Sequence, residues 1–458
     1  MRRPTTILAT IVAALLATAA VTSADAAGAR SHTYRISAGA WTAQTSGTIG
    51  FLSGVSCVNA AAAWASGQNG TILRTTNGGA SWVRLSSPAP AGEEVTDVEF
   101  VSPTTGWAIG SANAILKSTS GGTTWSAKSF LGFTYPPYLL TLSATDASHA
   151  WIGGYDSTGG FTYDAYYSIL LGTTDGSTWW SSAPMAAGDY GHGLTGIDFV
   201  DSQRGWAVTV DGSFTITTDG GRTWTTPLYP TGVDSFSDVS FADAANGWAV
   251  GQDSSYAGFI MHTTDGGRTW YRQAQSTLAA GPVSEVTAIC AVSPSVAWAV
   301  CRGGFVVYTT NAGGSWTIER PTTRDLKDVS FANADTGWIV GDAGTILRHG
   351  PRLAVDTVRP VPRALAAAKV KRGKMATLKY RVDDAAPSAG TATVVIKIKN
   401  AAGKVKKTLR LGRQPTGTAL KARFRANLKK GVYKWYVYAT DAAGNPQSKP
   451  ARQKLTVK

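Results

Sequence analysis

The chain has 458 residues, with 51 glycines, 16 tryptophans, 3 cysteines and a formal net charge of +14. This length accommodates two or three domains, and the abundance of Gly and Trp favours an all-β fold with many tight turns and large aromatic core residues. Three cysteines are too few for a fold built on disulfides, and no segment after the N-terminus is apolar for long enough to span a bilayer.

The charge is unevenly distributed along the chain. Residues 351–458 hold 26 Lys and Arg against 4 Asp and Glu, which leaves 17 against 25 for residues 1–350. An acidic body followed by a strongly basic part predicts two regions with different surface chemistry.

Residues 1–26 have the pattern of a secretory signal peptide. Arg2 and Arg3 precede an apolar run, Ile7–Val21, and Ala24–Ala26 supplies small residues for cleavage. The run is short for a membrane span. We therefore expect a secreted, extracellular protein, and leave open whether it associates with the cell wall.

Two short motifs recur between residues 39 and 350. One resembles TTDGGRTW and has six copies: Thr75–Trp82, Ser118–Trp125, Thr173–Trp179, Thr217–Trp224, Thr263–Trp270 and Thr309–Trp316. The other resembles GWAVG and has seven, centred on Trp64, Trp107, Trp151, Trp206, Trp248, Trp298 and Trp338. Each unit of 40–55 residues reads as four short strands separated by Gly, Asn and Asp, which is typical of a β-propeller blade.

The mismatch between seven units and six boxes predicts how the propeller closes. The seventh unit ends at Gly344–Gly350 without a fourth strand, whereas Gly39–Ser46 contains a spare strand with Trp41 at the box position. We therefore predict a seven-bladed β-propeller over residues 27–351, closed by its N-terminal strand, which removes exposed sheet edges.

The box itself is interpreted as a structural turn. Asp265 can accept hydrogen bonds from its own turn, and Gly266 and Gly267 tolerate positive φ. A phosphate-binding loop requires a following helix, and we expect none after any copy. The same structural role is predicted for Asn77, Ser120, Asp175, Asp219, Asp265 and Asn311.

These motifs resemble the Asp-box, or BNR repeat, of sialidases and other secreted propellers. With the GWxVG and GTIL patterns, the chain resembles the photosystem II stability/assembly factor propellers and their non-photosynthetic secreted relatives. The resemblance implies that the boxes lie on the outer rim, away from the ligand-binding face. It does not by itself imply photosystem assembly, because one fold serves many functions.

Sialidases carry an F/Y-R-I-P element and an arginine cluster, and the sequence departs from both. YRIS at Tyr34–Ser37 has Ser37 in place of the proline, and arginine is sparse in the propeller. Asp97, Asp238 and Asp328 recur at one repeat position, as structural residues would. We therefore expect no catalytic residue, with a secreted sialidase-like glycoside hydrolase as the alternative.

A ligand-binding face is predicted where the repeats are enlarged. The loops that enter units three to five, and those between the second and third strands of units three and five, open on the face opposite the boxes and are rich in tyrosine, which suits recognition loops. The alternative is that the tyrosines only pack these loops. The candidate residues for binding a protein or glycan are Tyr135, Tyr138, Tyr155, Asp156, Tyr163, Tyr166, Tyr167, Tyr190, His192, Tyr229 and Tyr256.

The remaining chemistry-bearing residues suggest no metal or cofactor. The histidines are scattered without metal-ligand spacing. Cys290 and Cys301 flank one predicted hairpin and are the candidate disulfide, whereas Cys57 takes a position that is Phe in other repeats and is read as a buried free thiol.

The basic part follows a Pro-containing linker, residues 352–364. Residues 365–458 show alternating strands typical of a β-sandwich. GVYKWYVYATDAAGN resembles bacterial Ig-like or fibronectin-like modules. The excess charge has two interpretations. It either forms a solvated face whose lysines keep strand edges from pairing, or it contacts a polyanion such as an anionic envelope polymer, which we favour. Nucleic acid is not expected, because no aromatic-basic RNA-binding signature is present. The expected function is a non-catalytic binding or scaffold protein of the cell envelope or extracellular space.

Overall fold

The computed structural model describes residues 41–89, 92–111, 114–128, 137–156, 167–182, 193–280, 283–350, 359–384, 391–441 and 446–458. The predicted signal peptide, residues 1–26, lies outside these ranges. The chain divides into two compact units between Pro351 and Arg352. Each unit is described by itself below.

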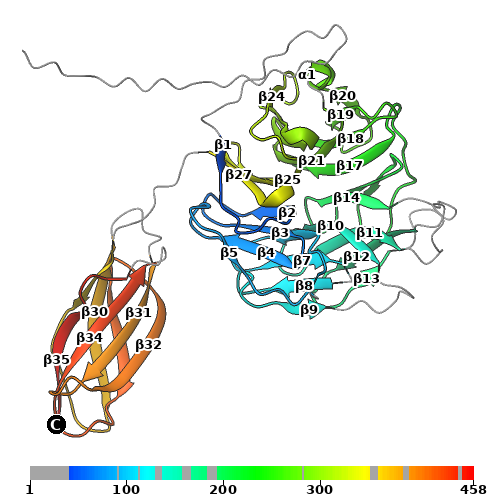
Figure 1. Ribbon diagram of the computed structural model, residues 1–458. Coiled ribbons are helices and arrows are strands. Elements are labelled where there is room, and N and C mark those ends of the chain that lie inside the picture. Colours follow the sequence, from blue (N-terminus) through cyan, green and yellow to red (C-terminus); the bar gives the residue numbers. More distant parts are fainter. Residues whose placement is uncertain are drawn as a thin grey trace, which may run out of the picture. The chain divides into compact units, whose positions relative to one another are not determined.

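The described part of the first unit contains seven small antiparallel sheets, which we number along the chain (Figure 1). Sheet 1 contains β2 (Leu52–Cys57), β3 (Ala63–Gly67), β4 (Thr71–Thr75) and β5 (Val83–Arg84). Sheet 2 contains β6 (Asp97–Phe100), β7 (Gly106–Gly110), β8 (Ala114–Ser118) and β9 (Ser126–Lys128). Sheet 3 contains β10 (Tyr138–Ala144), β11 (Ala150–Asp156), β12 (Tyr167–Thr173) and β13 (Trp180–Ser181).

The next sheets repeat this order. Sheet 4 contains β14 (Leu194–Phe199), β15 (Gly205–Thr209) and β16 (Phe214–Thr217). Sheet 5 contains β17 (Ser235–Phe241), β18 (Gly247–Gln252), β19 (Gly258–Thr263) and β20 (Tyr271–Gln273). Sheet 6 contains β21 (Val286–Ser293), β22 (Val296–Cys301), β23 (Val306–Thr309) and β24 (Thr317–Glu319). Sheet 7 contains β25 (Leu326–Asn333), β26 (Thr336–Gly341), β27 (Thr345–His349) and β1 (Trp41–Ala43).

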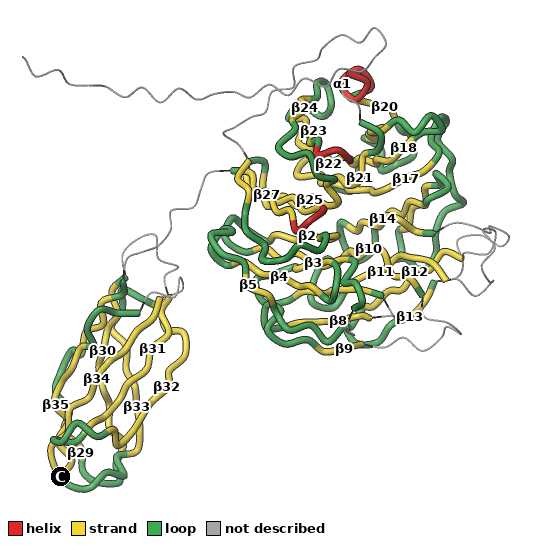
Figure 2. Tube along the Cα trace, in the orientation of Figure 1, coloured by secondary structure: helices red, strands yellow, loops and turns green. Residues whose placement is uncertain are grey.

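Helix is scarce in this unit, as the tube in Figure 2 shows. The described part has one α-helix, α1 (Gln275–Ala280), and the 3₁₀ turns η1 (Arg302–Gly304) and η2 (Asp342–Gly344). None of the helices in the described ranges has the length and apolar character needed to cross a membrane.

The sheets form a closed circle. The first strands of successive sheets, β2, β6, β10, β14, β17, β21 and β25, contact one another in this order, and β25 contacts β2. The N-terminal strand β1 pairs antiparallel with β27, with Trp41 opposite His349. The prediction that an N-terminal strand completes the last sheet is therefore confirmed.

Sheet 4 differs from the four-strand prediction. Its fourth segment forms only an isolated bridge between Phe214 and Leu228. Pro227 precedes Leu228 and has no backbone N–H to donate to a ladder, which explains why a longer strand does not form.

Stacked aromatic side chains join neighbouring sheets. The Trp of the second strand in one sheet lies flat on a Phe of the next sheet's first strand. Trp64 and Phe100 have centroids 3.7 Å apart, and so do Trp151 and Phe199. The same contact joins Trp206 to Phe241 at 3.6 Å and Trp298 to Phe331 at 4.4 Å. The tryptophans that dominate the composition are therefore architectural.

The Phe dictates the residue before each signature Trp. Where the first strand ends in Phe, the residue opposite is Gly, as in Phe241 opposite Gly247, and a Cβ on Gly247 would lie 2.4 Å from the Phe ring. Where the first strand has a small residue instead, the residue opposite is Ala, as in Ala144 opposite Ala150. In the sequence, a Gly before the signature Trp therefore indicates that a Phe lies opposite it on the first strand, and an Ala indicates a smaller residue there.

Junctions that lack the Phe use a polar side chain instead. At three of the four junctions with a Phe, the Trp indole N–H reaches the next box directly, as Trp64 does to Gly121 O at 3.1 Å. With Cys57 or Ala291 at this position, a glutamine bridges the junction. Gln44 accepts from Trp338 and donates to Gly78 O, and Gln273 accepts from Trp248 and donates to Ala312 O.

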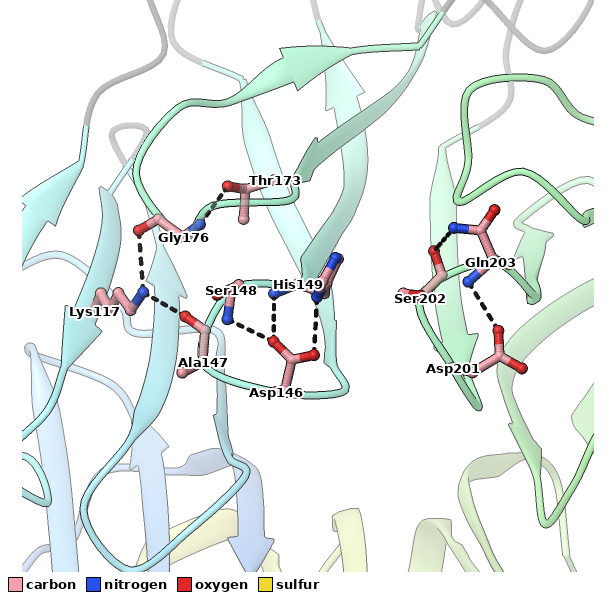
Figure 3. Close-up of polar contacts among 10 residues, drawn as sticks. All are labelled: Lys117, Asp146, Ala147, Ser148, His149, Thr173, Gly176, Asp201, Ser202 and Gln203. Atoms are coloured by element: carbon pink, nitrogen blue, oxygen red, sulfur yellow. Dashed lines mark hydrogen bonds and ion pairs between the residues drawn. The ribbon is translucent and has the colours of Figure 1, made fainter.

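Lys117 bridges the third junction of this kind, between sheets 2 and 3. Its ammonium lies 4.5 Å from the Trp107 ring centroid. It donates to Ala147 O and Gly176 O (Figure 3). The six box turns are therefore each anchored to the preceding sheet, either by an indole or by a substitute donor.

The second unit contains two sheets around one core. The first sheet has the order β28 (Val361–Ala364), β30 (Met375–Asp383), β33 (Ala419–Arg425). The second has the order β29 (Ala368–Val370), β35 (Ala451–Val457), β34 (Gly431–Asp441), β31 (Thr391–Lys399), β32 (Val405–Pro415). Leu378, Tyr380, Ile396 and Trp435 from both sheets share one buried cluster. This is the arrangement of a β-sandwich, and its Ig-like character remains a prediction.

Two sequence expectations need correction here. The predicted linker, residues 352–364, includes Val361–Ala364, which form β28 against β30. A short helix does follow one box, because α1 begins at Gln275 after the strand β20. Trp270 is nevertheless followed first by a strand, so the box is still not placed as a phosphate loop would be.

The disulfide expectation is also wrong, because Cys290 and Cys301 are free thiols. They lie on adjacent strands but out of register: Cys301 is opposite Val286 and Cys290 is opposite Trp298. At about 3.4 Å per residue, an offset of three or more positions exceeds the Cα separation of roughly 7 Å that a disulfide tolerates. Cys57 is free, as expected.

Gly247→Ala is expected to lower the free energy of unfolding by about 1–3 kcal/mol, because the added methyl group overlaps the Phe241 ring. Denaturant unfolding of the full chain measures the change. In a Phe241→Ala background the same substitution should cost much less, since Ala opposite a small residue is the natural arrangement elsewhere. Equal costs in both backgrounds would contradict this account.

Candidate functional site

The box turns are held by a repeated hydrogen-bond pattern. In the fifth copy, Thr263 Oγ1 donates to Asp265 Oδ1 at 2.8 Å and accepts from Gly267 N at 2.9 Å. Thr269 donates to Asp265 through its N–H and its hydroxyl, at 2.9 and 2.6 Å. Partial burial would raise the pKa of Asp265, but the hydrogen bonds from Thr269 and Thr263 outweigh it and lower the pKa to about 2.

The same pattern occurs in the other five copies, and in three of them an amide or a hydroxyl replaces the carboxylate. Asn77 and Asn311 accept from the N–H of Ser81 and Ser315, and Ser120 accepts from the N–H of Thr124. Asp175 and Asp219 accept from the N–H of Thr178 and Thr223. All six predicted box residues are thus engaged within their own turns, and a charge is not required.

Polar side chains on the first strands hydrogen-bond from sheet to sheet around the centre. One residue per sheet accepts from a backbone N–H of the next sheet's first strand: Ser56, Glu99, Ser143, Asp198, Ser240, Cys290 and Ser330. The last, Ser330 of sheet 7, accepts from Cys57 N of sheet 1 at 3.1 Å. These contacts complete the circle, and they occupy the Cys290 thiol. We call these seven residues the inner ring.

A second set of side chains, two positions earlier in the first strands, makes similar contacts. Asp97 accepts from Val98 N and from Leu142 N of the next sheet, at 2.7 and 2.9 Å. Asp238 accepts from Ile289 N at 2.9 Å, and Asp328 accepts from Val55 N at 2.6 Å. The interpretation of Asp97, Asp238 and Asp328 as a structural device is therefore confirmed.

Five carboxyl groups are concentrated around the centre by these contacts. Burial raises the pKa of Asp97, Asp198 and Asp238 to about 7 in each case, against the lowering effect of the N–H donors. Burial and the nearby Asp97 and Asp198 raise the pKa of Glu99 well above its usual range. Burial and Asp97 do the same for Asp328. Within the described ranges, no three His, Cys, Asp or Glu side chains are grouped to hold a metal ion.

The predicted tyrosine face is described only in part. Tyr135, Tyr163, Tyr166, Tyr190 and His192 lie outside the described residues. Asp156 and Tyr167 face each other in the β11–β12 ladder, and only their backbone is described. Tyr138 and Tyr155 lie side by side on β10 and β11, with ring centroids 4.9 Å apart and 17° between the rings. Tyr138 is 50% exposed, so the pair presents aromatic surface to solvent.

Tyr229 lies in the loop that enters β17 of sheet 5, and Tyr256 lies in the loop between β18 and β19. Both are at the same end of the sheets as the Tyr138–Tyr155 pair. This placement follows from the strand directions. In an antiparallel sheet, the loop that enters the first strand and the loop between the second and third strands lie at the same end. Tyr229 and Tyr256 are 56% and 71% exposed. The described residues therefore contain two separate tyrosine regions, on sheets 3 and 5.

A pocket lies beside sheet 5, and only one of its lining residues, Tyr256, is among the candidates from the sequence. Its volume is about 610 Å³, and its lining includes Tyr256, Asp253, Arg272 and Leu278 of α1. Tyr256 has a φ of 60°. Its N–H donates to Asp253 O, while Asp253 Oδ1 accepts from Ser255 and Ala257, which fixes the turn.

Arg272 connects the two loops that carry the tyrosines of sheet 5. It donates to Asp253 Oδ2 at 3.2 Å and to Gly232 O, and its guanidinium lies 5.1 Å from the Phe259 ring centroid. The hydrogen bond from the Ser255 side chain has the largest effect on the pKa of Asp253 and lowers it. Partial burial opposes this effect, but further hydrogen bonds from Ala257 and Arg272 also lower the pKa. The spacing between boxes gave no signal for this pocket, because α1 fits within an ordinary repeat length.

The titration of the central carboxyl groups gives a pH prediction. Their folded-state pKa values lie above those in an unfolded chain, about 4, so the folded state binds more protons between about pH 4 and pH 7. The free energy of unfolding should therefore fall as the pH rises through this interval. Glu99→Gln removes one of the repelling charges, and thermal unfolding from pH 4 to pH 8 should show a shallower fall.

Asp234→Asn is the matched control, because Asp234 lies exposed in a loop and its removal changes the net charge equally. It should leave the slope unchanged. An identical slope for Glu99→Gln and the native chain would show that the central carboxyl groups do not titrate in this way.

Comparison with known proteins agrees with the repeat pattern. Residues 177–323 match the family model described as photosynthesis system II assembly factor YCF48. The solved structure of YCF48 bound to a D1 peptide is 17% identical, with a TM-score of 0.54 over 69% of this chain and 98% of that chain. YCF48 from Cyanidioschyzon merolae is 19% identical, with a TM-score of 0.53 over 69% of this chain and 100% of that chain. No curated protein sequence matches significantly.

A GH74 xyloglucanase from Xanthomonas campestris is 13% identical over 84% of this chain and 75% of that chain, with a TM-score of 0.35. That likeness is too low to bear on the activity. The predicted resemblance to the assembly-factor propellers is confirmed by the family match and by the two YCF48 structures. Residues 41–350 therefore have the BNR-type β-propeller fold of the YCF48 structures, and residues 177–323 carry the sequence pattern of the YCF48 family.

Proposed function

We propose that the protein is an exported, non-catalytic binding protein whose propeller captures a segment of another protein through the tyrosine-bearing end of sheets 3 to 5. Its basic C-terminal unit contacts an anionic polymer of the cell envelope. The observation that carries the proposal is the exposed Tyr138–Tyr155 stack, which offers rigid aromatic surface on a sheet that other contacts already hold in place.

The state of the carboxyl groups supports a non-catalytic role. A paired-carboxylate glycosidase needs two carboxyl groups free to face a substrate. Asp97, Asp238 and Asp328 instead each accept backbone N–H groups from two neighbouring first strands. Their hydrogen-bonding capacity is directed at the fold.

The comparison supports a protein ligand. The similar structure of YCF48 is bound to a D1 peptide, so a propeller of this fold can hold a peptide segment. The pocket at Tyr256 adds a place for a side chain next to the Arg272–Asp253 pair. A glycan remains the other ligand class that such tyrosines could bind, and the test below separates the two.

The proposed export rests on residues 1–26, and the proposed anchoring on the C-terminal charge. Residues 351–458 hold 26 basic against 4 acidic residues, which favours attraction to polyanions. A basic anchor and a separate recognition surface would hold a captured partner at the envelope.

Probing arrays of synthetic peptides and of glycans with the full-length protein tests the ligand class. High salt is used, because it screens the basic unit. We expect binding to a subset of peptides, weakened at least fivefold by Tyr138→Ala with Tyr155→Ala. Tyr271→Ala is the matched control, since Tyr271 is 63% exposed and directly follows a box. It should leave binding unchanged.

Three results would contradict the proposal. Exclusive binding to glycans would replace the protein ligand with a carbohydrate. An equal effect of Tyr271→Ala would remove the tyrosine-bearing end from the site. Turnover of any of a panel of fluorogenic glycosides by the purified protein would show that it is a hydrolase.

A further inference from the structure

Three lysines lie directly side by side on the exposed face of the five-stranded sheet in the C-terminal unit. Lys399 of β31 is opposite Lys434 of β34, and Lys434 is opposite Lys454 of β35. Adjacent strands are about 4.8 Å apart. The three lysine side chains therefore project from directly neighbouring positions in a row that runs across the strands. We call Lys399, Lys434 and Lys454 the lysine row.

Like charges at directly opposite positions destabilise a sheet. The strands β31, β32, β34 and β35 contain only one acidic residue, Asp441, which is buried at the end of β34. The other sheet of this unit shows the contrast. Arg363 lies opposite Arg381 there, and Asp383 forms an ion pair with both. Asp383 thus neutralises the arginine pair from within that sheet, whereas the strands of the lysine row have no exposed carboxylate to do so.

The residues beside the lysine row extend its positive surface. Lys397 lies opposite Tyr436, which is opposite Arg452. The Lys399 ammonium lies 4.8 Å from the Tyr436 ring centroid, and the Lys397 ammonium lies 5.0 Å from that of Tyr438. The lysines therefore cover the two tyrosine rings, and the rings do not form an open platform for stacking.

We propose that the lysine row is the binding site for a linear polymer of phosphate groups, such as a phosphodiester polymer of the envelope. This rests on the proposed function, in which the C-terminal unit contacts polyanions. An ammonium group suits phosphate as a point charge, whereas Arg suits bidentate contacts. Residues two apart along a strand project about 6.7 Å apart on the same face, so the surface offers a grid of cations to an extended chain. Single-stranded nucleic acid would need free aromatic platforms.

Binding of long-chain inorganic polyphosphate to the full-length protein tests the proposal, with fluorescence anisotropy over a range of salt concentrations. The test variant is Lys399→Gln, Lys434→Gln, Lys454→Gln. The control variant is Lys379→Gln, Lys421→Gln, Arg423→Gln, on exposed positions of the other sheet, where Lys379 is opposite Lys421. Both variants lose the same charge. We expect roughly tenfold weaker binding and a shallower salt dependence for the test variant, and less than twofold for the control.

Folding provides a second readout. Removing three repelling charges should leave the unfolding temperature unchanged or raise it, and Lys434→Gln alone keeps the site testable if the triple variant is unstable. An equal loss of polyphosphate affinity in both variants would show that the lysine row is not the binding site, although the unit would still contact polyanions. No polyanion binding by the native protein would overturn both proposals. Tighter binding to phosphatidylserine vesicles, polygalacturonate or single-stranded DNA than to polyphosphate at the same salt would overturn the phosphate assignment.

Discussion

The propeller depends on the contact between the tryptophan of one sheet and the first strand and box turn of the next. A short four-stranded sheet buries too little on its own, so stability comes from the junctions between sheets. At four junctions the Trp stacks on a Phe, and the geometry is so close that Gly must stand opposite that Phe. Where the Phe is missing, Gln44, Gln273 or Lys117 replaces the lost contact with hydrogen bonds. Each repeat therefore meets the same packing requirement, either with a Trp–Phe stack or with a polar side chain that bridges the junction.

This requirement separates the roles of the polar groups. The box turns and the inner ring use short polar side chains, together with Glu99 and Cys290, to satisfy backbone N–H groups, which would be costly to bury unpaired. At the centre this leaves Asp97, Glu99 and Asp198 close enough to repel one another. The protein tolerates this repulsion because the same groups connect adjacent sheets. Residues engaged in this way are poorly suited to bind a substrate, which favours the exposed end of sheets 3 to 5 as the proposed binding surface.

In the C-terminal unit, charged side chains are not needed to hold the sheets together. The core of this unit is shared between two sheets and needs no charged group, so the exposed positions are free to carry cations. One sheet balances opposite arginines with Asp383, and the other leaves Lys399, Lys434 and Lys454 unbalanced. In our proposal, an external polyanion supplies the negative charge that this sheet lacks.

The repeats alone predicted the all-β propeller, the structural role of boxes such as that of Asp265, and closure by the strand at Trp41, because each repeat carries its own turn and packing signals. The sequence also located Tyr138 and Tyr155 through the enlargement of their loops. The sequence wrongly suggested a disulfide between Cys290 and Cys301, because pairing depends on the strand register. It also missed the pocket at Arg272, because α1 leaves the repeat length unchanged. The lysine row could not be predicted from the sequence, because Lys399, Lys434 and Lys454 are far apart in the chain. Only the pairing of β31, β34 and β35 places them side by side.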